Sequence, residues 1–468
     1  MSREKERQRL LIWTVFVSSL LMCALILYGM YSMVEPFFRV YPASLGAEGV
    51  GREGADLLSI LVRLLGAQPV LWYLFASFLV LVFLHELSYA PLSILHQYLQ
   101  KRREHPLDEW KKIPLVSIIV PAYNEEKVIE QTVRTLLELD YPNKEILVIN
   151  DGSTDNTEAV LRPYALQGKI QLINRPNAGK AEALNLGFNL ARGEIVVTID
   201  ADGALERRSV TRLVANFLDP DVVAVAGNVK VGNRTNILTK LQTLEYLRGI
   251  NLRRRAFDLL NTMDVMPGAL SSFRKSALNW VGFYERDTVT EDMDQTLKLV
   301  ETRMLVVYEP DAIVHTEVPE DLASLSRQRR RWYAGTVQVL KKHSAYWWKH
   351  GSLSFIGYPY LILSIILVPL IELTTLLLML IYGLLGKIVG ISIVMLQLIA
   401  LELALSALTI YLDKEDWSLL LYVPLYTLVY RYILDIFRII TYWDLYRGQA
   451  RWSRADRYGK LEDKIAIR

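Results

Sequence analysis

Long apolar stretches lie near both ends of this chain and enclose a polar middle. We expect membrane-spanning helices at residues 10–34, 69–98, 355–382 and 384–412, since each stretch is long enough to cross a hydrocarbon core of about 30 Å. Hydrophobic residues make up 52% of the 468 residues, yet 22% are charged, which is near the value for soluble proteins. The chain is therefore neither an all-membrane bundle nor a purely soluble enzyme, and it combines apolar spans with a sizeable polar domain.

A further apolar stretch, residues 417–442, allows two interpretations. Arg431, Asp435 and Arg438 recur in it at spacings of four and three, which places all three charges on one face of a helix. That pattern fits an amphipathic helix in the membrane interface as well as a true span, and both interpretations remain open.

The basic residues near the span ends predict the orientation. Four precede the first expected span, three follow the second, and seven more lie in residues 444–468. By the positive-inside rule, the N-terminus, the region from residue 101 onward and the C-terminal tail are expected in the cytoplasm. A cytoplasmic tail needs an even number of spans, which favours four full spans plus an interfacial helix. We therefore expect a multi-pass plasma-membrane protein whose polar domain is cytoplasmic.

The pattern changes between about residue 113 and residue 319, where short runs rich in Ile and Val alternate with helical stretches. This alternation predicts an α/β domain with a mostly parallel sheet covered by helices on both faces. In such sheets ligands bind at the carboxyl ends of the strands. The expected strands are 116–122, 145–150, 170–174, 194–199 and 222–229, and the expected helices are 125–139, 156–166, 179–192 and 207–218.

Acidic residues follow several of these strands. The first strand runs into Tyr123-Asn124-Glu125-Glu126, where Asn124 suits a helix cap as well as any of these residues suits a ligand. The second runs into Asp151-Gly152. Asp151 there either turns toward a base or ribose, or belongs to an ordinary Asp-Gly turn.

The fourth expected strand ends in Asp200-Ala201-Asp202. Because the chain turns at the strand end, both carboxylates can face one cleft. A nucleotide diphosphate normally needs a hard divalent cation, and carboxylates are natural ligands for magnesium or manganese. A lone Asp-x-Asp occurs often by chance, but its place at a strand end favours a functional site.

Two later motifs each have a structural and a functional interpretation. Thr290-Glu291-Asp292 precedes a helix expected at 293–302, so it is either ordinary capping or a source of a general base. Gln328-Arg329-Arg330-Arg331-Trp332 is either a basic interfacial helix, or a site where Arg neutralises a diphosphate and Trp stacks on a sugar. Lys180, at the start of an expected helix, would add positive charge.

Asp151, Asp200-Ala201-Asp202, Thr290-Glu291-Asp292 and the Gln-x-x-Arg-Trp motif occur here in one order. In this set the chain resembles the membrane-embedded, processive, inverting family-2 glycosyltransferases, which include cellulose, hyaluronan, chitin and poly-N-acetylglucosamine synthases. Thr316-Glu317-Val318-Pro319 ahead of the last motif resembles the bacterial poly-N-acetylglucosamine synthase type in particular. Each motif alone is weak, whereas the full set is specific and the resemblance covers the whole chain.

The resemblance implies an architecture. A GT-A-type, Rossmann-like domain would be inserted between transmembrane helices. The implied parts are an N-terminal membrane region at 1–100, the cytoplasmic glycosyltransferase domain at 101–319, amphipathic interface helices at 320–352, C-terminal membrane helices at 353–443 and a basic cytoplasmic tail at 444–468.

The resemblance also implies a reaction and its partners. The enzyme would transfer sugar from UDP-N-acetylglucosamine or UDP-glucose to a growing β-linked polysaccharide and move the polymer across the bilayer. Its cofactor would be Mg²⁺ or Mn²⁺, and a small membrane accessory subunit is a further partner for which the resemblance leaves room. The net charge of +3 is too small to predict a nucleic-acid partner.

The implied roles carry over residue by residue. Asp292 would be the base that deprotonates the acceptor, beside Glu291, and Asp202 would hold the metal. Thr290 and Trp332 would contact the acceptor sugar. The nucleotide sugar would be held by Tyr123, Glu125, Asp151, Lys180, Asp200, Asp202, Gln328, Arg330 and Arg331.

Two alternatives remain. A nonprocessive transferase that acts on dolichyl or polyprenyl phosphate would share the strands and the Asp-x-Asp motif, but it usually lacks Gln-x-x-Arg-Trp and two preceding spans. A catalytically inactive membrane scaffold would not need intact acids at four separate places. Release of nucleotide from a sugar nucleotide distinguishes an enzyme from the scaffold.

Overall fold

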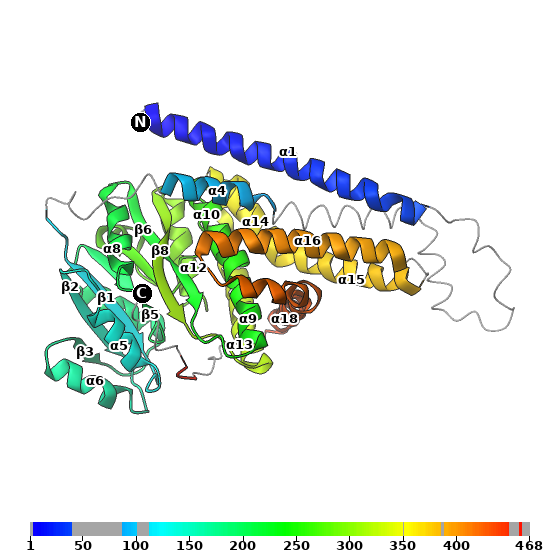
Figure 1. Ribbon diagram of the computed structural model, residues 1–468. Helices are drawn as coiled ribbons and strands as arrows, with labels where there is room; N and C mark the ends of the chain where they lie inside the picture. The colour runs from blue at the N-terminus through cyan, green and yellow to red at the C-terminus, as the bar shows by residue number, and fades with distance from the viewer. Residues whose placement is uncertain are drawn as a thin grey trace.

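The computed structural model describes residues 3–39, 87–100, 112–349, 351–384, 388–448 and 458–460. In these residues an eight-stranded sheet forms the centre of one domain, with the strand order β3-β2-β1-β4-β7-β6-β8-β5 (Figure 1). The strands are β1 (Val116–Ala122), β2 (Lys144–Asn150), β3 (Gln171–Asn174), β4 (Ile195–Thr198), β5 (Ala204–Leu205), β6 (Val222–Val231), β7 (Ser271–Arg274) and β8 (Leu305–Thr316).

The α/β fold class is confirmed, and the sheet is mixed. β1 pairs in parallel with β2 and β4, and β2 pairs in parallel with β3, so these four strands end at one edge. β7 runs antiparallel to both β4 and β6. The sequence analysis did not predict β5, β7 or β8. β7 has only four residues and no apolar run, and Pro310 interrupts the apolar pattern of β8, so neither carries the usual strand signal.

Helices cover both faces of the sheet because side chains alternate along each strand. Ile118 of β1 belongs to one core cluster, with α5 (Ile129–Leu137) and α8 (Ser209–Ala215). Ile119, the next residue, belongs to the other, with α7 (Lys180–Leu190) and α12 (Glu291–Glu301). Each fully buried side chain of this kind contributes roughly 1.5–3 kcal/mol. The two layers therefore fix where β1 and β4 end and where α7 and α12 begin.

The first helix of the domain starts later than the expected 125. α5 begins at Ile129 with Val128 at its N-cap, so Asn124 does not cap it. Instead Asn124 has φ 54°, and its Oδ1 accepts a hydrogen bond from the Thr154 amide at 2.7 Å. The local bond to a neighbouring loop replaces the predicted cap, because Asn tolerates this left-handed conformation.

Further helices belong to this domain, to the apolar region or to the segment between them. They are α4 (Tyr89–Gln100), α6 (Thr157–Leu166), α9 (Ile237–Glu245), η3 (Tyr246–Leu252), α10 (Arg253–Leu260), α11 (Lys275–Val281), α13 (Leu322–Lys342), α14 (Tyr358–Ile362), α15 (Val368–Leu384), α16 (Ile388–Asp413) and α18 (Arg431–Tyr446). Figure 1 shows α15 and α16 extending away from the sheet, with α1 (Arg3–Arg39) running alongside them. α16 contacts η3 and α4, and α13 packs against α18.

Three helical stretches in the described residues are long and apolar enough to cross a membrane: Leu353–Leu384, Ile388–Asp413 and Trp417–Tyr446. They coincide with the last three apolar stretches of the sequence, as is expected of a membrane protein. The expected span at 10–34 lies within α1. Of the expected span at 69–98, residues 69–86 lie outside the described residues, and its end belongs to α4, which packs on α10.

The charged residues of the Trp417–Tyr446 stretch contact neighbouring helices. Arg431 donates to Glu402 of α16 at 2.6 Å and also pairs with Glu372 of α15. Arg248 of η3 pairs with Glu402 from the other side. Arg431 is therefore paired inside the helical bundle, and whether this stretch is a span or an interfacial helix stays a prediction.

Candidate active site

The loops after β1 and β2 are joined by hydrogen bonds. The Glu125 amide donates to Thr157 Oγ1 at 2.8 Å, and the Glu126 amide donates to Asp155 Oδ2 at 3.2 Å. Glu125 is buried, whereas Tyr123 is 36% exposed. The two predicted nucleotide-binding residues therefore lie at one edge of the sheet, and only Tyr123 presents much surface for a ligand.

Asp151 at the end of β2 organises the next loop. Its carboxylate is buried and accepts hydrogen bonds from the amides of Ala178 at 3.1 Å and Gly179 at 2.8 Å. Arg175 also pairs with it, at 3.2 Å. A carboxylate held by backbone N–H groups and an arginine fixes the loop strongly. Asp151 thus sets the start of α7, and its contact with a base stays a prediction.

Lys180, the first residue of α7, lies between two acidic motifs that are far apart in the sequence. Its Nζ is 2.6 Å from Asp200 Oδ1, beyond β4, and 3.5 Å from Glu291 Oε1, on α12. Burial lowers the pKa of Lys180, but the charges of Asp200, Glu291 and Asp292 outweigh burial and raise that pKa above its ordinary value. Lys180 therefore remains cationic and joins motifs that lie far apart in the sequence.

Gly268, which precedes β7, allows this close approach. A Cβ at this position would lie 2.8 Å from Lys180 Nζ and 3.5 Å from Asp200 Oδ2. Its amide donates to Asp292 Oδ2 at 3.3 Å. Any side chain here would compete with the ion pair, so the Gly268 backbone links the end of β4 to the start of α12. Gly268 was not predicted from the sequence, where its only signal is the turn-forming Pro267-Gly268 pair.

Asp292 has the properties of a general base. Burial raises its pKa, the negative charges of Glu291 and Asp200 raise it further, and Lys180 and the Met293 amide lower it, with a resulting pKa of about 6. The Met293 amide donates to its Oδ1 at 2.9 Å. A carboxylate with a pKa near the operating pH accepts a proton most effectively. The structure thus places Asp292, Glu291 and Asp200 around one lysine.

Asp202 lies deeper than Asp200. It is 2% exposed, and its Oδ2 accepts a hydrogen bond from Thr316 Oγ1 at 3.1 Å. Asp200 and Asp202 offer hard carboxylate oxygens at the strand ends, which is the donor set that Mg²⁺ or Mn²⁺ prefers. The residues therefore fit a divalent cation. The neighbouring His315 lies 3.1 Å from Glu206 and contacts neither aspartate of the Asp-x-Asp motif in the interactions described.

The residues of the Gln328–Trp332 motif separate on two faces of α13. Arg329 is fully buried and donates to both carboxylate oxygens of Glu245, at 2.9 and 2.8 Å. Its guanidinium also lies 4.2 Å from the centre of the Trp332 ring. Arg330 pairs with Asp444 of α18. A helix turns by about 100° per residue, so Arg330 points away from Trp332. Arg329 contacts both Trp332 and Gln328, whose Oε1 accepts a hydrogen bond from its guanidinium.

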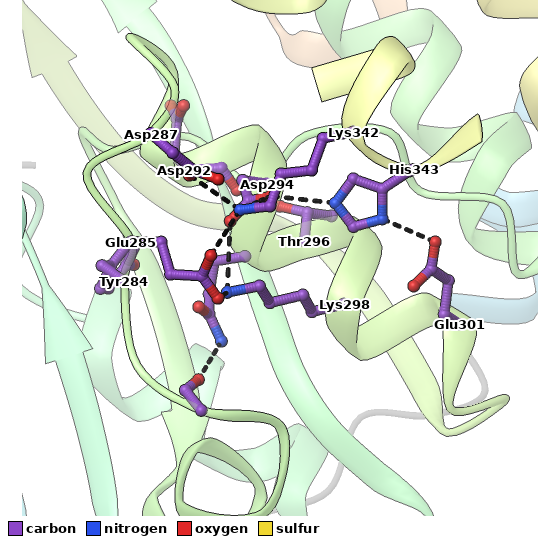
Figure 2. A network of polar contacts seen from close by, with 12 residues as sticks. Tyr284, Glu285, Asp287, Asp292, Asp294, Thr296, Lys298, Glu301, Lys342 and His343 are labelled. Carbon is purple, nitrogen blue, oxygen red and sulfur yellow. Dashed lines mark hydrogen bonds and ion pairs between the residues drawn. The ribbon is translucent and has the colours of Figure 1, made fainter. Parts of the chain in front are cut away.

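The opposite end of α13 meets a second acidic cluster, shown in Figure 2. The carboxylates of Glu285, Asp287 and Asp294 lie close enough to hold a metal ion. However, Lys342 Nζ lies 2.7 to 2.9 Å from all three, and Lys298 Nζ lies 3.3 Å from Asp294. Two ammonium groups thus already compensate the charge that a cation would neutralise.

Sequence comparisons relate this chain to known glycosyltransferases. Residues 117–281 match the family described as Glycosyl transferase family 2. The poly-beta-1,6-N-acetyl-D-glucosamine synthase of Staphylococcus epidermidis is 35% identical over 234 residues, which is 50% of this chain and 57% of that protein. The enzyme of the same name from Staphylococcus aureus strain COL is 35% identical over 244 residues, 52% of this chain and 58% of that protein. The matches thus span less than two thirds of these relatives.

A solved structure resembles the fold. The mannosyltransferase PcManGT from Pyrobaculum calidifontis, in complex with GDP-Man and Mn²⁺, has a TM-score of 0.55 and 22% sequence identity, and the match covers 81% of this chain and 100% of that chain. At this identity the likeness shows the fold alone. It agrees with the predicted GT-A-type domain.

Proposed function

We propose that this chain, which carries a glycosyl transferase family 2 domain at residues 117–281, extends a polysaccharide from a nucleotide sugar in the membrane. The donor is UDP-N-acetylglucosamine or UDP-glucose, with the first favoured by the names of the similar synthases. The product is β-linked and is passed through the bilayer as it grows. The polar domain faces the cytoplasm, where nucleotide sugars are made.

The observation that carries this proposal is the meeting of Asp200 and Asp292 across Gly268, with Lys180 between them. A cation such as Lys180 can stabilise an anionic leaving group, and a carboxylate such as Asp292 can accept the proton of the acceptor hydroxyl. The acceptor hydroxyl oxygen attacks the anomeric carbon and its proton passes to Asp292. The bond from the anomeric carbon to the diphosphate breaks, and the nucleotide leaves. Attack from the face opposite the leaving group inverts the configuration.

The leaving diphosphate needs positive charge, because negative charge develops on it as the bond breaks. Lys180 supplies one such charge close to Asp200. Arg331 and Gln328 of α13 are proposed to reach the diphosphate as well; both are partly buried, and Gln328 Oε1 accepts a hydrogen bond from Arg329. When bound, a divalent cation at Asp202 supplies further positive charge to the leaving group.

Trp332 is proposed to hold the terminal sugar of the acceptor. It lies three residues before Gly335, which contacts Thr290 closely, so it belongs to the part of α13 that approaches the start of α12. A sugar polymer cannot enter lipid unaided, because each unpaired hydroxyl costs roughly 2–7 kcal/mol in an apolar phase. The apolar helices after residue 353 are therefore proposed to receive the growing chain.

The test uses membranes that contain the full chain. They are incubated separately with labelled UDP-N-acetylglucosamine, UDP-glucose and GDP-mannose, and both released nucleotide and product size are measured. Long polymer from one donor is the expected result. If only mono- or disaccharide-lipid forms at all times and donor concentrations, the synthase proposal is wrong and the lipid-phosphate transferase takes its place. Absence of nucleotide release from every donor would support the scaffold.

A further inference from the structure

α13 contacts the start of α12 along one face. Gly335 approaches Thr290 so closely that a Cβ would lie 2.4 Å from its side chain. One turn later, Gln338 Oε1 accepts a hydrogen bond from the Val289 amide at 3.1 Å. Lys342 then reaches the acidic cluster. With about 100° per residue, Gly335, Gln338 and Lys342 share one face of α13 with Arg331. One helix surface therefore carries part of the Gln328–Trp332 motif and also contacts the segment before Asp292.

A further contact with α12 comes from His343, just after the end of α13. Its ring is 4% exposed and lies between two carboxylates of α12 (Figure 2). Nε2 is 2.9 Å from Asp294 Oδ1 and Nδ1 is 2.7 Å from Glu301 Oε1. An ionised carboxylate only accepts hydrogen bonds. Both ring nitrogens must therefore donate, which makes His343 an imidazolium that joins the two ends of α12.

The surroundings of His343 favour this charged form. Burial lowers the pKa of His343, but hydrogen bonds and charge from Asp294 and Glu301 outweigh burial and raise that pKa to about 9. Two further cations, Lys342 and Lys298, also lie close to Asp294, at 2.9 and 3.3 Å. Glu301 in turn accepts a hydrogen bond from Tyr358 Oη at 2.6 Å. Tyr358 starts α14, inside the first apolar stretch after the domain.

We propose that His343 is a positioning residue for the transfer reaction, holding α12, and with it Asp292, at a fixed place relative to α13. This inference rests on the proposed function. Asp294 lies two residues after Asp292 on the same helix, so a displacement of Asp294 moves the base directly. His343 touches neither nucleotide nor acceptor, and its effect is confined to the alignment of base and acceptor hydroxyl.

The test compares His343→Gln with wild type in the membrane-bound full chain, with UDP-N-acetylglucosamine as donor, or with whichever of the three labelled donors the wild type uses. Glutamine fills similar space but cannot donate to both carboxylates as a cation. We expect kcat to fall at least about tenfold, because a misplacement of about 1 Å costs up to a hundredfold. The donor KM should stay within about twofold, since the strand-end loops that bind the nucleotide are untouched.

His96→Gln is the matched control. His96 Nε2 lies 2.7 Å from Asp258 Oδ2, both side chains are buried, and the pair joins α4 to α10 instead of α12 to α13. The control loses a similar buried contact, so its thermal stability should fall while kcat is kept. An equal loss of kcat in His96→Gln and His343→Gln would mean general destabilisation and would overturn the proposal.

Two further variants keep the test decisive if His343→Gln does not accumulate in the membrane. Glu301→Gln keeps the contact with Asp294 and weakens the second one, and Lys342→Met removes the neighbouring cation. Both should lower kcat at constant donor KM. If both keep kcat within about twofold of wild type, His343 has no positioning role. Wild type that uses none of the three donors would instead overturn the proposed function, which separates the two failures.

Discussion

Gly335→Ala should damage catalysis through a single methyl group. The added Cβ would lie 2.4 Å from both Oγ1 and Cγ2 of Thr290, and 2.8 Å from its Cβ. Carbon atoms pack at about 3.5–4.0 Å, so the overlap is about 1 Å. Rotation of the Thr290 side chain cannot relieve it, because the Thr290 Cβ itself is too close. The start of α12 must therefore move by about 1 Å relative to α13, and Asp292 follows two residues later.

A shift of this size predicts a kcat loss of up to about a hundredfold. Overpacking would also cost about 1–3 kcal/mol of stability, partly offset because Ala is favoured over Gly in a helix by about 1 kcal/mol. The assay is the initial rate of nucleotide release at saturating donor, with thermal unfolding followed in parallel.

Gly249→Ala serves as the control for Gly335→Ala. Gly249 lies in η3, and a Cβ there would meet nothing within 4 Å. The control should keep its kcat and be as stable as wild type or more so. Wild-type kcat in a folded Gly335→Ala variant would refute the reasoning, because it would show that α12 and Asp292 can move apart from α13 without cost.

Four other outcomes are expected. Asp292→Asn should keep nucleotide binding by calorimetry but slow transfer at least about a hundredfold, as for a lost general base. The wild-type rate should fall as pH drops through about 6, since only the ionised form of Asp292, with its pKa raised to about 6 by burial and by Glu291, accepts a proton; a flat profile from pH 5 to 8 would contradict this. Chelator should abolish activity and Mn²⁺ or Mg²⁺ should restore it, whereas Asp202→Ala should lose that response. Full activity of the wild type in chelator would show that the reaction needs no metal. Trp332→Ala should shorten the polymer on a sizing gel with nucleotide binding kept, and unchanged length would exclude its acceptor role.

The local elements could be predicted because their signals are local. β1 covers the expected 116–122, and α6 starts one residue from the expected 156. Apolar runs bounded by turn residues specify such elements without reference to the rest of the chain. β7 lacks such a local signal. It consists of Ser271–Arg274, and its place between β4 and β6 depends on pairing with strands that are distant in the sequence.

The candidate site depended more on contacts between distant segments. Asp200 and Asp292 were each expected at the site, but nothing in the sequence indicates that Lys180 bridges their motifs or that Gly268 makes room for the bridge. The assignment of Arg330 to the nucleotide is not tested, although its pairing with Asp444 gives it a structural partner.

Helical periodicity alone would have separated Arg330 from Trp332 on α13. For His343 no such local signal exists, because its partners Asp294 and Glu301 come from a different helix.

The charges between the apolar helices have a consequence for how the chain is made. Glu372 and Glu402 leave the ribosome before Arg431, their shared partner on α18, while Arg248 is already present in the preceding domain. An acidic side chain at the centre of a bilayer costs about 2.5–3.5 kcal/mol on insertion scales. α15 and α16 are therefore expected to be less stable as an isolated pair than with Arg431 of α18 and Arg248 of η3 in place. Synthesis that stops after residue 413 would leave both glutamates without Arg431, an incomplete product that membrane quality control can recognise.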